Sequence, residues 1–101
     1  MNKKQSTLLN IAQKSRDDVQ SMKKAIKDLG KEVPMITVLE VACMNNNINI
    51  AMYLFEVYKT EILKGCKNQF EVVEICAQEG FNNTLEWYRC TVCGLRPILI
   101  D

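Results

Sequence analysis

Apolar residues recur along the first thirty positions with the alternating spacing of three and four that is typical of one face of a helix. The positions on this seam are Leu8, Ala12, Ser15, Val19, Met22, Ile26 and Leu29. We therefore expect one long amphipathic helix over residues 6–30. Ser6 is its expected N-cap, and Gly30 is the left-handed residue expected to end it.

The same seam predicts self-association, because apolar residues held at heptad spacing over three repeats can join two helices in a coiled coil. The residues expected in such a homodimer contact are Leu8, Val19, Met22, Ile26 and Leu29. The alternative is that this face packs against the rest of the chain, and the spacing alone leaves both possibilities open.

A helical hairpin is predicted over residues 37–65. Thr37 and Glu40 have the spacing of a capping box, in which a hydroxyl and a carboxylate satisfy the exposed N–H groups of a helix start. Residues 45–47 are all asparagine, which favours a turn because its side chain bonds to nearby backbone and tolerates left-handed conformations. A second helix is expected after this turn, with Gly65 as its end.

A second helical hairpin is predicted over residues 68–94. Gly80 is expected to end its first helix. Asn83 and Glu86 have the spacing of a capping box, which can cap the second helix. Residues 95–101 form a short apolar tail. The predicted fold is therefore all-α, a single domain over residues 1–101 in which a long N-terminal amphipathic helix precedes two stacked helical hairpins.

The two predicted hairpins share a pattern at an offset of 34 residues. When residues 37–55 are laid over residues 71–89, eight of the 19 aligned pairs are apolar in both copies. A repeat of this length is typical of stacked helical units. Both copies also carry two adjacent small residues, which would let neighbouring helices approach closely. These small residues are Ala42, Cys43, Cys76 and Ala77.

Residues 37–55 resemble the core of an ankyrin repeat. The matching residues are Thr37 and Leu39 in the family's opening, Ala42 and Cys43 in its small pair, Asn46 in its turn, and Ile50, Leu54 and Phe55 in its outer helix. In the second copy the matching residues are Cys76, Ala77, Gly80 and Leu85. The resemblance implies a scaffold that binds proteins along its inner helices and turns, and a generic stack of helical hairpins is the alternative.

By this resemblance, the residues expected to contact a partner protein lie in and beside the two turns. They are Met44, Asn45, Asn46, Gln78, Glu79 and Phe81. Phe81 is the most suggestive of them, because an exposed aromatic side chain often anchors an interface. The alternative for Phe81 is that it covers the core between the two repeats.

Composition then narrows the function classes. The 101 residues include no histidine, which removes the commonest general base and the commonest metal ligand. We therefore predict a protein that is not an enzyme and that holds no cofactor and no metal. No stretch approaches the roughly 20 apolar residues needed to cross a bilayer, so no membrane contact is expected.

The five cysteines are an odd number without the spacing of a disulfide framework, which favours free thiols in a reducing compartment. The expected location is the cytoplasm, or the host cytoplasm or nucleus for a viral protein. The abundance of Asn, Lys and Ile is typical of AT-rich genomes such as those of many viruses and phages. The leading prediction is a non-catalytic protein–protein interaction module, such as a small viral or phage regulator or inhibitor of a host protein.

One alternative rests on charge. Residues 1–31 carry a net charge of +5 and residues 32–101 a net charge of −4. A basic first helix could contact phosphates electrostatically, which would make the chain a nucleic-acid-associated regulator. The lysines available for this are Lys14, Lys23, Lys24 and Lys27. Because no DNA- or RNA-binding motif is present, nucleic acid is the less favoured partner.

The other alternative is a small zinc-binding protein. Cys90 and Cys93 have the spacing of half a zinc site, and Cys66 is the best candidate for a third ligand. Structural zinc takes four ligands as a rule, and without histidine only cysteines and carboxylates remain. The structural interpretation, two ordinary thiols at a helix end, is favoured over the metal.

Overall fold

The computed structural model describes residues 7–14, 16–65 and 70–94. In chain order its elements are α1 (Thr7–Gln13), α2 (Val19–Leu29), α3 (Met35–Met44), α4 (Ile48–Val57), α5 (Lys59–Gly65), α6 (Phe70–Glu79), α7 (Asn82–Trp87) and a π-helical turn (Tyr88–Cys93) that continues α7. The described residues contain no strand, so the predicted all-α class is confirmed for this part of the chain.

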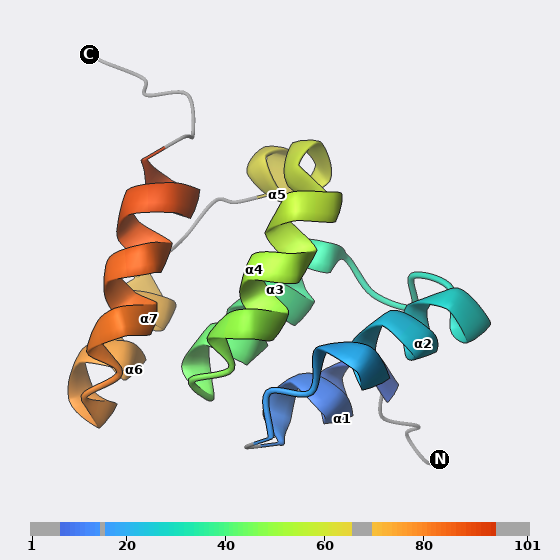
Figure 1. The fold of residues 1–101 in the computed structure, drawn as a ribbon. Coiled ribbons are helices and arrows are strands. Elements are labelled where there is room, and N and C mark those ends of the chain that lie inside the picture. Colours follow the sequence, from blue (N-terminus) through green and yellow to red (C-terminus); the bar gives the residue numbers. More distant parts are fainter. Residues whose placement is uncertain (1–6, 15, 66–69, 95–101) are drawn as a thin grey trace, which may run out of the picture.

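The helices lie in three neighbouring pairs (Figure 1). α3 and α4 form the middle pair, with α1 and α2 on one side and α6 and α7 on the other. α3 contacts both α1 and α6, whereas the short helix α5 packs against α3 and α4. The first and last pairs therefore form the two ends of this part of the molecule.

The predicted single helix over residues 6–30 is wrong, because the chain turns back between α1 and α2. Asp17 has a φ of 51°, which a continuing helix does not allow, and the Asp18 carboxylate accepts a bond of 3.1 Å from the Ser21 backbone N–H as the N-cap of α2. The predicted end of this region is confirmed: Gly30 has a φ of 77° and donates its N–H to the Ile26 carbonyl.

Burial is greatest along α3, which lies between α1 and α6. Val38, Leu39, Ala42 and Cys43 have no exposed surface. The close approach expected at the small residues is present between α3 and α6, where the Cys76 thiol donates to the Cys43 carbonyl oxygen at 3.4 Å. The prediction fails at the fourth small residue, because Ala77 is exposed on α6.

The turns that follow α3 and α6 have the same backbone geometry. Asn46 and Gly80 are both left-handed, with φ of 62° and 77°, and they lie 34 residues apart. After α3, the Asn47 N–H donates to the Ala42 carbonyl at 2.8 Å, and after α6, the Phe81 N–H makes the equivalent bond to the Cys76 carbonyl at 2.9 Å. These bonds define a Schellman motif, so the 34-residue offset of the sequence reappears in the backbone.

Two helix starts differ from the predicted capping boxes. α3 begins at Met35 rather than Thr37, since the Thr37 N–H already bonds to the Pro34 carbonyl at 3.0 Å. α7 begins at Asn82, one residue before the expected cap at Asn83. The expected cap Ser6 lies outside the described residues.

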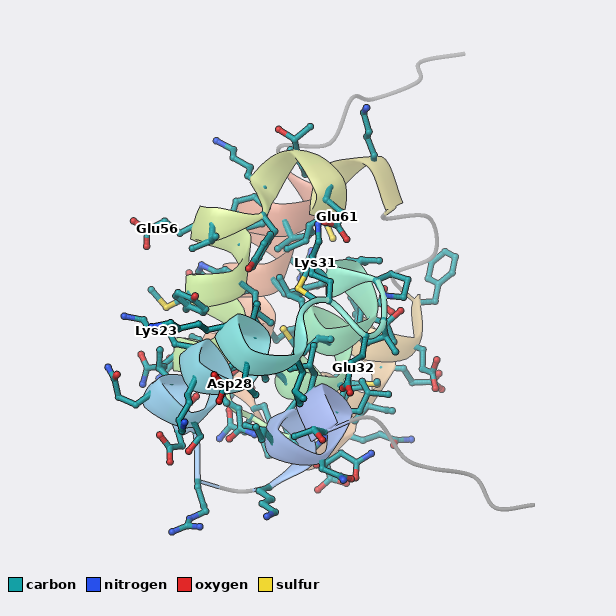
Figure 2. All side chains as sticks on the ribbon, turned by 90° about the vertical axis from the view of Figure 1, so that its right-hand side faces the viewer. Lys23, Asp28, Lys31, Glu32, Glu56 and Glu61 are labelled. Atoms are coloured by element: carbon teal, nitrogen blue, oxygen red, sulfur yellow. The ribbon has the colours of Figure 1, made fainter. Side chains whose placement is uncertain are left out.

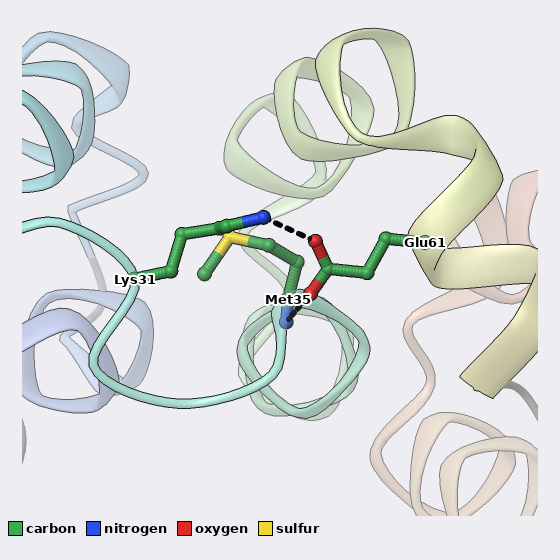
Figure 3. Close-up of polar contacts among 3 residues, drawn as sticks. All are labelled: Lys31, Met35 and Glu61. Atoms are coloured by element: carbon green, nitrogen blue, oxygen red, sulfur yellow. Dashed lines mark hydrogen bonds and ion pairs between the residues drawn. The ribbon is translucent and has the colours of Figure 1, made fainter.

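The second helix of the predicted hairpin over residues 37–65 is divided. α4 ends at Val57, Tyr58 donates its N–H to the Leu54 carbonyl, and α5 then runs to Gly65. A side chain of α5 explains why α3 starts early: the Glu61 carboxylate accepts a bond of 3.1 Å from the Met35 N–H (Figure 3). α3 is therefore capped by a residue 26 positions further along the chain.

Candidate functional site

The turns of the three helix pairs lie along one edge of the molecule, the lower edge in Figure 1. We call this edge the turn edge and define it by residues 14–18, 44–47 and 78–82, apart from Ser15, which lies outside the described residues. Because helices α1, α3 and α6 all end here, the turns of segments distant in sequence lie along the same edge.

Buried polar side chains fix neighbouring turns to one another. The Asn47 side chain, 2% exposed, donates to the carbonyl oxygens of Ala12 and Lys14 at 2.7 and 2.6 Å. Thr84 is fully buried, and its hydroxyl donates to the Asn46 amide oxygen at 2.7 Å. Buried polar groups are costly unless bonded, so these contacts set the relative position of the turns.

A third link joins the first turn to the middle pair. Asp17 accepts bonds from the backbone N–H groups of Asn49 and Ile50 at 3.0 and 2.9 Å, and from the Asn49 side-chain amide at 2.9 Å. A carboxylate at this place accepts hydrogen bonds from the backbone N–H groups that are left free at the start of α4. Its negative charge is also attracted to the positive end of the α4 helix dipole. This contact is the physical reason for the break between α1 and α2.

The structure brings the predicted partner-binding residues to two neighbouring turns, and the bond from Thr84 of α7 to Asn46 joins the two helix pairs that carry them. Three of the six are exposed, namely Asn46, Gln78 and Glu79, and the other three, Met44, Asn45 and Phe81, are partly buried. Asn45 donates its side-chain amide to the Val41 carbonyl at 2.8 Å. Phe81 packs against the core, which agrees with the alternative that it covers the core rather than anchoring a partner.

Sequence reasoning missed the three residues that organise this edge, Asp17, Asn47 and Thr84. The adjacent acids Asp17 and Asp18, which interrupt an apolar seam, are the local signal that was available for the first of them. Asn47 was expected in a turn but not as a buried link, and nothing local in the sequence marks Thr84, because its partner lies 38 residues away.

Acidic side chains meet where α3 and α6 pack together. Burial raises the pKa of the half-buried Glu40 carboxyl on α3, and the negative charge of Glu71 on α6 raises it further. Glu40 lies in the middle of α3 and Glu71 in the first turn of α6, so this negative charge lies away from the turn edge.

The predicted self-association seam is internal. Leu8 and Met22 are fully buried, and Val19 and Ile26 pack partly buried against the core. The break between α1 and α2 folds the seam on itself, so these residues cannot form a coiled coil between two copies as they stand. Of the predicted set, Leu29 is the one that is exposed, at 50%.

The lysines expected to contact phosphate are divided among different contacts. Lys24 pairs with Asp28 at 3.0 Å, and the Lys23 ammonium lies 5.3 Å from the centre of the Tyr53 ring. Figure 2 shows Lys23, Asp28 and the neighbouring Lys31 on this side of the molecule. Lys14 and Lys27 are exposed, but α1 and α2 are separate helices, so the lysines do not share the single basic face that the sequence suggested.

The thiols give little support for chemistry in the part of the chain that the structure describes. Cys43 and Cys76 are buried, and burial raises the pKa of both thiols, which makes them poor nucleophiles. Cys90 is exposed and Cys93 partly exposed, whereas Cys66 lies outside the described residues. Among the described side chains, no three His, Cys, Asp or Glu residues are placed to hold a metal ion.

A comparison with protein-family models found no match, and comparisons with curated proteins and with solved structures found none either. Over residues 7–14, 16–65 and 70–94, none of the helices has both the length and the apolar character needed to cross a membrane.

Proposed function

We propose that the chain is a non-catalytic protein-interaction module that binds a partner protein along the turn edge and acts as a small regulator or inhibitor of that partner. The residues proposed to carry binding are the exposed Asn46, Gln78 and Glu79, with Met44 and Asn45 beside them. These side chains offer amide donors, amide acceptors and one carboxylate, which suits hydrogen bonding to a protein surface.

The observation that carries the proposal is the bond of 2.7 Å from Thr84, in the first turn of α7, to Asn46 in the turn that follows α3. A surface held in place before binding loses less conformational freedom when a partner is bound, and this favours affinity. The Schellman motifs after α3 and α6 add to the same effect, because they fix the backbone of both turns.

Resemblance to ankyrin repeats supports the choice of surface. Helix pairs α3–α4 and α6–α7 lie side by side, with turns 34 residues apart, and this is the arrangement expected of a stack of helical repeats. We propose that the stack includes α1 and α2 as its first unit, although their sequence did not suggest it. Families of stacked repeats bind partners on such extended surfaces.

A site-specific photocrosslinking experiment tests the proposal in native lysate. A photoreactive residue at Gln78 is expected to give a discrete protein adduct, whereas the same residue at Lys64, exposed on α5 away from the turn edge, is expected to give none. Mass spectrometry of the adduct identifies the partner. Equal labelling from both positions, or labelling from neither, contradicts the proposal.

A binding measurement with the identified partner then separates the turn edge from the rest of the surface. The double variant Gln78→Ala, Glu79→Ala is expected to weaken affinity at least about tenfold, while Lys64→Ala leaves it unchanged. All three positions are exposed, so the fold is expected to survive in each variant. Adducts with nucleic acid in place of protein would favour the charge-based alternative instead.

A further inference from the structure

An apolar stripe runs along the side of α6 that the described residues leave open. Its members are Phe70, Val73 and Ala77, spaced three and four residues apart so that they share one face of the helix. Phe70 is 81% exposed. Together with Arg89, Cys93 and Gly94, Phe70 and Val73 line a groove of about 380 Å³.

The equivalent stripe on α3 is covered. The residues 34 positions earlier are Ile36, Leu39 and Cys43, of which Leu39 and Cys43 are fully buried and Ile36 is 8% exposed. Gly65 of α5 lies close to the Ile36 side chain, and the Cys76 thiol of α6 bonds to the Cys43 carbonyl oxygen. The α3 stripe is therefore covered, with α5 at its start and α6 at its end, whereas at the equivalent positions of α6 Phe70 and Ala77 are exposed and Val73 is partly exposed.

The two ends of the molecule carry opposite charge. Residues 7–29, which form the first pair, include five lysines and arginines and three aspartates, a net charge of +2. Residues 70–94, which form the last pair, include four glutamates and one arginine, a net charge of −3. The two pairs lie on opposite sides of the middle pair (Figure 1).

We propose that a second copy of this chain occupies the open face of α6, with its first pair, α1 and α2, stacked on the last pair of its neighbour. Charge complementarity selects this head-to-tail arrangement, because a +2 end then meets a −3 end. A tail-to-tail dimer would place two −3 ends together, which is unfavourable. Leu29 at the end of α2, 50% exposed, is an apolar side chain that the first pair offers for this contact.

Such a contact joins two different surfaces of the chain, the first pair (the head) and the last pair (the tail). Each time a copy is added, the assembly therefore still has one free head and one free tail. An interface of this kind gives chains or rings rather than a closed dimer. The association is expected to weaken with added salt, since the screening length falls from about 30 Å at 0.01 M to about 3 Å at 1 M.

Two blocked variants of the full chain test the proposal by analytical ultracentrifugation at low salt. The head-blocked variant carries Lys24→Glu and Lys27→Glu, which reverse the charge of the first pair. The tail-blocked variant carries Phe70→Asp at the exposed stripe. We expect each variant alone to be monomeric at high micromolar concentration, and an equimolar mixture to form dimers but nothing larger, because it contains one intact head and one intact tail per pair.

Circular dichroism checks that both variants keep the helical content of the wild type, and Lys64→Glu on α5 is the matched charge change away from both ends. Lys64→Glu is expected to associate as the wild type does. A wild type that stays monomeric at high micromolar concentration overturns the proposal. Dimers of the head-blocked variant alone also overturn it, because they show tail-to-tail pairing, and so does a mixture that remains monomeric.

Discussion

Helices α3 and α6 carry the same pattern of apolar and small residues, yet one is covered and the other open. Leu39 of α3 is fully buried, while its equivalent Val73 on α6 is partly exposed, and the buried Cys43 corresponds to the exposed Ala77. The pattern therefore marks a face that can be packed against. Whether the face is packed depends on the place of the helix in the row of pairs.

Truncation of the equivalent large residues is the strongest test of this difference. Leu39→Ala is expected to lower the free energy of unfolding by roughly 2–5 kcal/mol, because it leaves a cavity in the core. Val73→Ala is expected to lower it by about 1 kcal/mol or less, because its surroundings are partly solvent. Urea denaturation followed by circular dichroism measures both, and equal losses would show that the face of α6 is covered after all.

Substitution at the two left-handed turn positions gives the next largest effects. Gly80→Ala is expected to cost roughly 1–2 kcal/mol, and since a methyl group there would meet no neighbour within 4 Å, the whole cost is conformational. Asn46→Ala is expected to cost about 1 kcal/mol more, because it also removes the acceptor of the buried Thr84 hydroxyl.

Asn46→Gly separates the two parts of that cost, since glycine accepts a φ of 62° and lacks the side-chain acceptor. We expect its destabilisation to equal the contribution of the Thr84 bond alone. Thermal unfolding of the three variants side by side measures the difference. If Asn46→Ala and Gly80→Ala are equally destabilising, the bond between the turns contributes nothing to stability.

Acid titration gives the smallest effects, with opposite signs at two glutamates. Hydrogen bonds from Lys31 and from the Met35 N–H lower the pKa of Glu61 below its ordinary 4.5. Its contribution to stability is therefore present above pH 4.5 and is lost as the pH falls through its folded-state pKa. Burial and Glu71 raise the pKa of Glu40, so protonation of Glu40 favours the folded state, and its unfavourable contribution grows as the pH rises above 4.5.

We therefore expect Glu61→Gln to lower the thermal midpoint at pH 7 and Glu40→Gln to raise it. Both differences from the wild type are expected to shrink as the pH falls and each carboxyl is protonated, at a lower pH for Glu61 than for Glu40 because their pKa values are shifted in opposite directions. Differential scanning calorimetry across this range checks the signs. A Glu40→Gln variant that is less stable than the wild type at pH 7 would refute the assigned cause.

The sequence predicted well those features that depend on neighbouring residues. The all-α class, the helix ends at Gly30 and Gly80 and the turn at Asn46 follow from local periodicity and from residues that tolerate a positive φ. The failures share one cause, which is contact between distant segments. The break at Asp17 depends on α4, and the start of α3 depends on Glu61, and neither partner is near in sequence.

The candidate site was predicted in outline, as two turns, but not in its organisation. The spacing placed Asn46 and Gln78 on neighbouring turns, whereas Phe81 turned out to pack against the core. An aromatic residue in a polar segment can either cover the core or anchor a partner protein. Which of the two it does depends on the residues that surround it in the folded chain. The same limit explains the internal seam, because Leu8 and Met22 face a core that is built by later parts of the chain.

Carboxylates from distant segments complete the starts of three helices. Glu32 accepts from the Thr7 N–H at 3.0 Å, Asp17 from the Ile50 N–H and Glu61 from the Met35 N–H, across 25, 33 and 26 residues of chain. Of these three contacts, the one from Asp17 to the start of α4 joins two helix pairs, the first and the middle. These two pairs should therefore melt together rather than fray one by one, and the amide of Ile50 should exchange with solvent as slowly as the most protected amides of the core.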